Sequence, residues 1–366
     1  MANLRLLFIC RKQFGYSIDN YYHCKYLKDT YDITYFSPDT GLDKIAMEGA
    51  NINYIVFTRN RIFNNIKFYW KACEKIKAGH YNIIILNRSY FFFIFKVFNP
   101  GKKFIYDIRS GVVNSSFFKR IVYTQLIKLD LMFFKNVTII SNSLAKQLKI
   151  RNYVLLPLGA ERLKIPDKEF DNLSLVYVGS FNNRRIEDTI EGLWLYLNEY
   201  GRDHDISYHI YGFGDHDSEA RISDAIVKYK LQDQVFFHGR INHQDLVVVL
   251  GKSNVGVSYL PLTPYFDVQP PTKTFEYLLA GMPVIATKTK EHQQIINENN
   301  GVLVSDNSYD FMRGLEVLYN KSKSNHFSSK EIISESIDYS WENIVRNNLQ
   351  TYIEKLVKKV DVAHNQ

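Results

Sequence analysis

The sequence is poor in cysteine and has no long apolar run. Its three cysteines, Cys10, Cys24 and Cys73, show neither metal-binding nor redox spacing, which favours a reducing cytoplasm over an oxidising compartment. The longest apolar stretches, such as residues 91–95, fall far short of the roughly 20 residues that cross a bilayer. The opening segment MANLRLLFICRK lacks the basic region and the cleavage site of a signal peptide. We therefore expect a cytoplasmic chain without a membrane span.

Several kinds of catalytic motif are absent as well. No pair of carboxylates of the glycosidase type stands out, and no DxD-like metal motif lies near the end of a predicted strand. The histidines are scattered and form no cluster with zinc-ligand spacing. The sequence therefore predicts no metal site and no cofactor.

Acidic residues are scarce in the first half of the chain. Residues 1–165 contain 26 Lys and Arg against 10 Asp and Glu, a balance of +16, whereas residues 166–366 contain 20 against 28, a balance of −8. This division indicates that the first half meets an anionic partner, which on charge alone is nucleic acid, phospholipid or an acidic substrate. No recognised nucleic-acid-binding motif is present, so we expect no nucleic acid partner.

Two stretches carry much of this positive charge. Residues 59–77 hold six cations and one acid, and residues 96–135 hold eight cations and two acids, both interleaved with aromatic and aliphatic side chains. Basic, aromatic helices of this kind suit an anionic membrane surface. The alternative is an ordinary helix with a lysine-rich outer face.

The sequence does contain ample apolar material, arranged as alternating strands and helices. Hydrophobic residues make up 46% of the sequence, which is enough for sizeable cores. The length of 366 residues predicts two domains. Short, nearly continuous apolar strands alternate with helical stretches, including 62–78 and 116–134, which indicates a doubly wound α/β domain with a parallel sheet. The strands predicted in the first half are 4–10, 32–37, 81–87, 103–108 and 136–141.

A second alternation follows a linker at 154–170. Three of its predicted strands end in Gly179, Gly212 and Gly239. Because ligands of open α/β sheets bind beyond the carboxyl ends of the strands, we expect the binding chemistry at these turns. Apolar residues at helical spacing over 341–360 predict a terminal amphipathic helix. The strands predicted in this half are 173–179, 207–212, 234–239, 254–260 and 283–287.

The most informative segment is PPTKTFEYLLAGMPVIA, residues 270–286. Pro271 restrains the chain before a helix, whose N-terminus offers unpaired N–H groups to an anion, and Lys273 adds a positive charge there. Glu276 lies one turn into this helix, where its carboxylate can accept hydrogen bonds from sugar hydroxyls. Gly281 and Pro283 end the helix before the next strand. The alternative is a capped helix with solvated Lys and Glu side chains.

This segment resembles the nucleotide-sugar signature of retaining glycosyltransferases with the GT-B fold, specifically glycosyltransferase family 4 (group 1). Residues 137–161, 175–193, 208–215 and 235–261 resemble other segments of that family in order and spacing. The resemblance implies an α/β GT-B fold, that is, two Rossmann-like, doubly wound domains with an interdomain cleft. We expect an acceptor-side domain at 1–160, a nucleotide-sugar-binding domain at 161–340, and a helix at 341–366 that returns toward the first domain.

The resemblance also implies roles for single residues. Glu276 would bind the ribose hydroxyls, and Lys273 would act on the diphosphate with the helix start near Thr272 and Thr274. The family's pair of cations after Gly179 corresponds to Ser180 and Arg185 here, so one cation is missing. Arg184 or Lys273 would then supply the missing positive charge. Val268 stands where the family often has Glu. The further residues expected to bind the nucleotide sugar are Gly15, Gly179, Gly212, Gly214, Gly239 and Arg240.

Arg109 is a third candidate catalytic residue beside Lys273 and Arg185. It follows a predicted strand of the first half, where it either faces the acceptor or forms a structural ion pair with Asp107. The sequence leaves both possibilities open.

The resemblance implies transfer of a sugar, with retention of configuration, from a nucleotide sugar, preferably a UDP-sugar. The acceptor would be a glycan, such as a lipid-linked intermediate of bacterial surface polysaccharide synthesis. The protein would then lie peripherally on the inner face of the cell membrane. Two alternatives remain: a GT-B nucleotide-sugar epimerase, and a degenerate GT-B protein that serves as a non-catalytic partner subunit.

Overall fold

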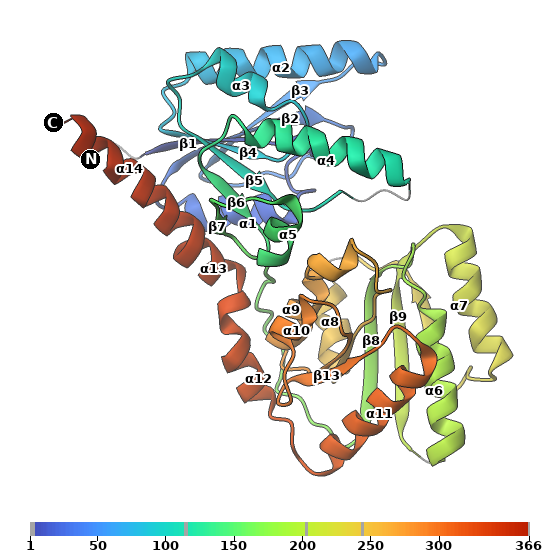
Figure 1. Ribbon diagram of the computed structural model, residues 1–366. Helices are drawn as coiled ribbons and strands as arrows, with labels where there is room; N and C mark the ends of the chain where they lie inside the picture. Colours follow the sequence, from blue (N-terminus) through green and yellow to red (C-terminus); the bar gives the residue numbers. More distant parts are fainter. Residues whose placement is uncertain (1–3, 113–115, 202–203, 243–244, 365–366) are drawn as a thin grey trace. The chain divides into compact units, whose positions relative to one another are not determined.

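The computed structural model describes residues 4–112, 116–201, 204–242 and 245–364. The chain forms two α/β units, each built on a parallel sheet (Figure 1). Unit 1 consists of Met1–Leu158 and Trp341–Gln366, and unit 2 of Gly159–Ser340. The fold class predicted from the alternation of strands and helices is therefore confirmed.

The sheet of unit 1 has seven strands in the order β3-β2-β1-β4-β5-β6-β7. All five strands predicted in this half are present. The sequence missed β3, a half-polar strand in which only Ile55 is buried, and β7, which has two residues. The strands are β1 (Arg5–Ile9), β2 (Asp32–Asp39), β3 (Ala50–Val56), β4 (Ile83–Asn87), β5 (Phe104–Ile108), β6 (Val137–Ile139) and β7 (Val154–Leu155).

The helices of unit 1 cover both faces of this sheet. The chain steps from β1 to β2 in one direction and from β3 through β4 and β5 to β6 in the other. Because such crossovers are right-handed, α1 lies on one face and α2, α3 and α4 lie on the other (Figure 1). The helices are α1 (Ile18–Leu27), α2 (Arg61–Ala78), α3 (Phe93–Phe98), α4 (Phe117–Leu131) and α5 (Asn142–Leu148).

The C-terminal segment completes unit 1. Its buried Trp341 stacks on Tyr22 of α1, with ring centroids 5.5 Å apart. The structure corrects one detail of the prediction, because the expected single helix is interrupted by a π-helical segment. The segment comprises α13 (Trp341–Ile344), the π-helix η4 (Val345–Gln350) and α14 (Thr351–His364).

The sheet of unit 2 has six strands in the order β10-β9-β8-β11-β12-β13. The five predicted strands are present, and the sequence missed the four-residue β13. The strands are β8 (Leu173–Ser180), β9 (Ile206–Phe213), β10 (Val235–Gly239), β11 (Val255–Ser258), β12 (Val284–Thr287) and β13 (Gly301–Val304). The helices are α6 (Glu187–Tyr200), α7 (His216–Lys228), α8 (Leu246–Lys252), η2 (Phe266–Val268), α9 (Thr272–Leu279), α10 (His292–Ile295), α11 (Ser308–Lys323), α12 (Ser329–Ser336) and η3 (Ile337–Tyr339).

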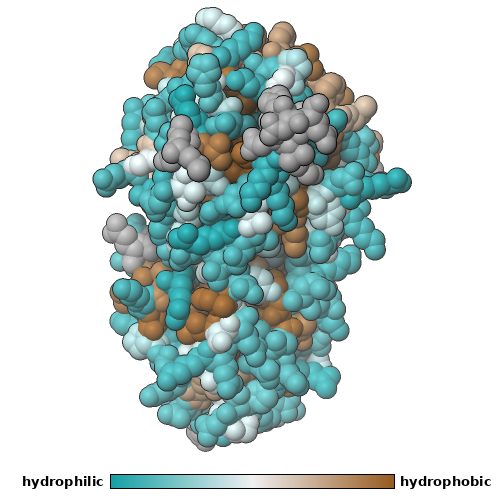
Figure 2. Space-filling view, turned by 90° about the vertical axis from the view of Figure 1, so that its left-hand side faces the viewer, coloured by the Kyte–Doolittle hydropathy of each residue, from teal (hydrophilic) through white to brown (hydrophobic). Residues whose placement is uncertain are grey.

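Hydrophilic residues cover most of the face drawn in Figure 2, and apolar residues form separate patches on it. Among the described residues, no helix combines the length and the apolar character needed to cross a bilayer.

Candidate functional site

Two glycines face each other on neighbouring strands at the carboxyl edge of the unit 2 sheet. Gly179 of β8 pairs with Gly212 of β9. A Cβ atom added to Gly212 would lie 1.8 Å from the carbonyl oxygen of Gly179, so only glycine fits there. The two loops that follow these strands can therefore lie close to each other and to the start of α9.

The side chain of Lys273, from the first turn of α9, lies beside this pair of glycines. Its ammonium is 3.4 Å from the centroid of the Tyr177 ring and 3.0 Å from the position of a Cβ atom on Gly179. Only 9% of the residue is exposed, and its Nζ has no hydrogen-bond partner. Burial, and after it the charge of Arg184, lowers the pKa of Lys273 well below that of an ordinary lysine. An anionic ligand would therefore stabilise the charged form of the Lys273 side chain.

Arg184, in the loop between β8 and α6, supplies a second cation. Its guanidinium stacks over the Phe266 ring at 4.2 Å, and its buried Nε and Nη1 have no hydrogen-bond partner. Burial lowers the pKa of Arg184. Two neighbouring cations, both with unsatisfied donors, form a site that suits a diphosphate.

Glu276 lies one turn beyond Lys273 on α9. Its carboxylate makes no hydrogen bond or ion pair with any residue that the structure describes. Burial raises the pKa of this carboxyl, and the charge of Lys273 opposes that shift. The side chain is thus left with free acceptor oxygens near the charge of Lys273, and its binding of sugar hydroxyls stays a prediction.

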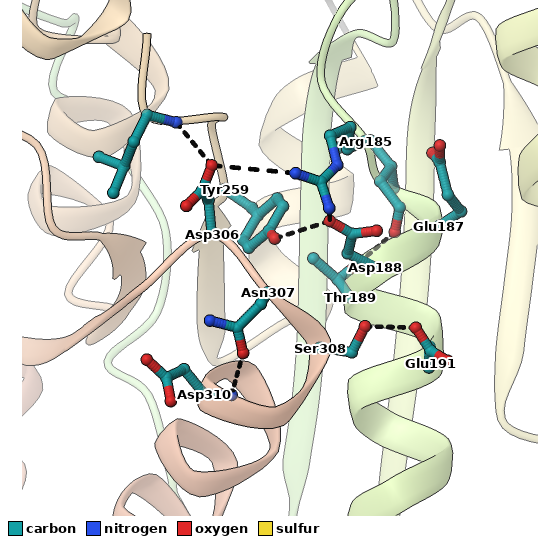
Figure 3. A network of polar contacts seen from close by, with 12 residues as sticks. Arg185, Glu187, Asp188, Thr189, Glu191, Tyr259, Asp306, Asn307, Ser308 and Asp310 are labelled. Atoms are coloured by element: carbon teal, nitrogen blue, oxygen red, sulfur yellow. Dashed lines mark hydrogen bonds and ion pairs between the residues drawn. The ribbon is translucent and has the colours of Figure 1, made fainter.

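Arg185 has a different environment from Arg184. Its guanidinium forms ion pairs with Asp188 at 2.6 Å and with Asp306 at 3.9 Å, and 51% of the side chain is exposed (Figure 3). Tyr259 donates a hydrogen bond to the same Asp188 carboxylate. The catalytic role that the sequence predicts for Arg185 stays a prediction. In the structure its charge is already balanced by two carboxylates, whereas Arg184 keeps unsatisfied donors.

Buried hydrogen bonds that the sequence does not predict hold the first turn of α9 in place. The imidazole Nδ1 of His292 lies 2.6 Å from the carbonyl oxygen of Thr287, which only accepts, so this nitrogen carries the proton. Its Nε2 is then an acceptor that lies 3.1 and 3.0 Å from the hydroxyls of Ser258 and Thr274. These hydroxyls also lie 2.8 Å apart, so one of them donates to the ring and the other donates to its neighbouring hydroxyl. Burial lowers the pKa of His292 to about 4, so the ring is neutral at neutral pH. Thr274 therefore positions α9 through its side chain, rather than offering that side chain to a ligand.

The other predicted residues of unit 2 lie at or just after the carboxyl ends of β8, β9 and β10, and at the start of α9. The backbone oxygen of Ser180 accepts a hydrogen bond from Tyr177, the amide of Gly214 donates to Glu219, and Arg240 stacks over Phe213 at 4.8 Å. Gly239 has a left-handed φ of +69° with open space around it, and the half-buried Thr272 begins α9.

The position where the family often has Glu offers no carboxylate to the site. Val268 is buried. The neighbouring Asp267 forms an ion pair with Lys290 at 2.6 Å.

The two predicted residues of unit 1 are each held within that unit. The buried guanidinium of Arg109 donates to Asp19 at 2.8 Å and to the carbonyl oxygens of Leu156 and Pro157, and it lies 3.7 Å from Asp107. These contacts favour the structural ion pair over a group that faces an acceptor. Gly15 has a φ of +90°, and a Cβ atom there would lie 2.3 Å from the end of the Ile45 side chain.

Within the described part of the chain, no three His, Cys, Asp or Glu side chains lie close enough together to hold a metal ion. The prediction of a site without metal or cofactor remains a prediction.

Two doubly wound α/β units, each built on a parallel sheet, define a protein of the GT-B fold. Residues 172–321 match the family model "Glycosyl transferases group 1", so the resemblance seen in the sequence is confirmed. No curated protein matches the chain. Solved structures similar to the chain include a glycosyltransferase from Rickettsia africae (TM-score 0.70, 15% identity, 98% of this chain and 100% of that one). They also include a sucrose-phosphate synthase from Thermosynechococcus elongatus (0.68, 18%, 99% and 100%) and Anabaena HepE in complex with UDP and glucose (0.71, 13%, 96% and 99%).

Proposed function

We propose that this protein transfers a sugar from a nucleotide-sugar donor to a glycan acceptor, with retention of anomeric configuration. The observation that carries the proposal is the pair of cations at the carboxyl edge of the unit 2 sheet, the buried Lys273 and the half-buried Arg184, whose buried donors lack hydrogen-bond partners. Unsatisfied buried donors are costly, and a diphosphate would satisfy them. Retention rests on the family resemblance alone.

The two cations would act on the leaving group. When the bond between the anomeric carbon and the diphosphate breaks, negative charge builds on the diphosphate oxygens. Cations that are already in place stabilise this charge more in the transition state than in the ground state. Glu276, with its free acceptor oxygens, would hold the ribose hydroxyls and so fix the nucleotide relative to Lys273.

We propose a UDP-sugar as the donor, supported by the similarity to a structure described as a complex with UDP and glucose. For the acceptor we propose a lipid-linked intermediate of bacterial surface polysaccharide synthesis, which the protein would meet at the inner face of the cell membrane. The excess of positive charge in residues 1–165 supports an acceptor held at an anionic surface.

The adjacent arginines provide a matched test of the diphosphate site. We expect Arg184→Gln to weaken nucleotide diphosphate binding by roughly 30-fold or more, since removing one partner of a buried charge pair costs about 2 kcal/mol or more. Arg185→Gln should change the affinity less than about threefold, because its partners are Asp188 and Asp306. Calorimetric titration of both variants checks this. The reverse order of effects would assign the role to Arg185.

Titration of the wild type and of Glu276→Ala with UDP and with GDP tests the proposed function. We expect micromolar binding of one nucleotide, preferably UDP, and a loss of about tenfold or more in the variant, because the ribose hydroxyls lose a charged acceptor. Release of that nucleotide from its sugar on addition of an acceptor would then establish transfer. Failure of the wild type to bind either nucleotide would favour the non-catalytic partner subunit instead.

A further inference from the structure

The outer surface of α2, α3 and α4 in unit 1 exposes apolar side chains that a folded domain normally buries. We call this surface the outer helical face. On α2, Ile62, Ile66 and Trp70 follow one another at intervals of four residues, so they form one stripe along the helix. All three are exposed, Trp70 by 63%.

α4 continues the same pattern. Phe118, Val122 and Leu129 are spaced by four and seven residues and are exposed on one side of the helix. Met132, directly after the helix, is 81% exposed, and Phe98 at the end of α3 is exposed as well. These side chains stand on the outside of the helices, opposite the sheet.

The three helices form one continuous layer on their face of the sheet (Figure 1). The rings of Tyr69 on α2 and Phe95 on α3 lie 5.3 Å apart, and those of Phe93 on α3 and Phe133 after α4 lie 4.9 Å apart. The amide of Phe93 also donates a hydrogen bond to the buried Asp130 of α4. The apolar stripes therefore belong to a single surface.

The charges on this surface have one sign. The cations of α2 and α4 include Arg61, Lys67, Lys71, Lys119 and Lys128, with Lys135 just beyond α4. Residues 59–135 contain only three acids: Asp107 and Asp130 are buried, and the exposed Glu74 pairs with Lys71. Nothing acidic on these helices balances the remaining cations.

We propose that the outer helical face binds an anionic lipid bilayer, with its apolar side chains in the interfacial region and its lysines on the headgroups. A single-sign surface would repel a second copy of itself. Nucleic acid would use the cations but would leave Ile62, Ile66 and Met132 in water. A bilayer satisfies both kinds of side chain, and a Trp flanked by lysines is typical of the membrane interface. This inference does not rest on the proposed transfer reaction.

Sedimentation with vesicles tests the proposal. The full-length protein should bind vesicles rich in phosphatidylglycerol and leave phosphatidylcholine vesicles unbound. Lys119→Gln/Lys128→Gln/Lys135→Gln should lower the partition coefficient about 100-fold, since each cation near an anionic surface contributes roughly fivefold. Ile66→Gln/Trp70→Gln/Met132→Gln should lower it about tenfold or more through lost apolar burial. The tryptophan emission should shift to the blue when vesicles are added, and this shift should be absent from the variant that lacks Trp70.

The control is Val227→Gln/Val248→Gln/Val317→Gln, which changes three exposed valines of unit 2 and should leave the partition unchanged. All variants should keep the nucleotide affinity of the wild type, so a failed fold or a failed transfer proposal is distinguished from a failed membrane proposal. Equal partition to neutral and anionic vesicles would overturn the inference. So would binding that the apolar substitutions leave intact, or tighter binding to duplex DNA than to anionic vesicles.

Discussion

Lys273→Met should abolish tight nucleotide binding and at the same time make unit 2 more stable. The ammonium of Lys273 is buried against Tyr177 without a hydrogen-bond partner. Methionine has a similar length and no charge, so it removes the cost of burying that ammonium. A residue that lowers the stability of the free protein, but supplies the charge a diphosphate needs, is expected at a binding site.

The two effects have opposite signs and can be measured separately. Nucleotide affinity should fall by roughly 30-fold or more, which corresponds to about 2 kcal/mol or more for one partner of a buried charge pair. The free energy of unfolding should rise by about 1 kcal/mol or more, because apolar replacement of an uncompensated buried charge is stabilising. Calorimetric titration and thermal unfolding of the same samples check both.

The pH dependence gives the prediction a further check. The folded-state pKa of Lys273 is depressed, so between that pKa and the ordinary lysine pKa the unfolded chain binds more protons than the folded one. The stability of the wild type relative to Lys273→Met should therefore rise with pH over this window.

Lys252→Met, which changes an exposed lysine of the same unit, is the control for this substitution. It should alter neither stability nor affinity. A Lys273→Met protein that is less stable than the wild type and still binds nucleotide would contradict the assignment of Lys273.

Gly212→Ala should disrupt unit 2 and the nucleotide site together. The added methyl carbon would lie 1.8 Å from the carbonyl oxygen of Gly179, a backbone atom that cannot rotate away. The two strands must separate, and the loops that carry Arg184 and approach Lys273 must move with them. We expect a loss of about 3 kcal/mol or more in the free energy of unfolding, the size seen when a close backbone approach is blocked.

The control for Gly212→Ala is Gly201→Ala. Gly201 also has a positive φ, +100°, but nothing lies within 4 Å of its added Cβ atom. This variant should lose about 1–3 kcal/mol, the cost of the backbone conformation alone, and should keep its nucleotide affinity. Urea unfolding and calorimetry separate the two cases. Equal losses in both variants would show that φ, rather than the contact with Gly179, is what matters.

Most of the fold could be predicted from the sequence, because buried parallel strands are continuous apolar runs. The core strand β4, with four consecutive buried residues, and β8, which has Gly179 before its last residue, are examples. The strands that were missed carry weak signals. β3 and β13 are only partly buried because each lies at an edge of its sheet, and β7 has only two residues.

The site could be predicted in part. Lys273 and Glu276 stand in a segment whose prolines and glycine mark the helix ends, so their neighbourhood could be recognised. Which of Arg184 and Arg185 keeps unpaired donors could not be predicted, because it depends on the backbone conformation of the loop. Asn183 and Arg185 both have left-handed φ values, 58° and 53°. This conformation is uncommon for an arginine, so the sequence does not predict the direction of the Arg185 side chain. His292 contacts residues of three other elements, β11, α9 and β12, so no local sequence pattern predicts these contacts.

The central claim is that the unpaired cations of unit 2 bind the diphosphate of a nucleotide. The most direct measurement compares, by calorimetry, the affinity of the wild type for whichever of UDP and GDP binds with its affinity for the matching nucleoside. The account predicts micromolar binding of the diphosphate, binding of the nucleoside that is weaker by about 100-fold or more, and a smaller gap in Arg184→Gln. Equal affinities for diphosphate and nucleoside, or a gap that Arg184→Gln leaves unchanged, would contradict it.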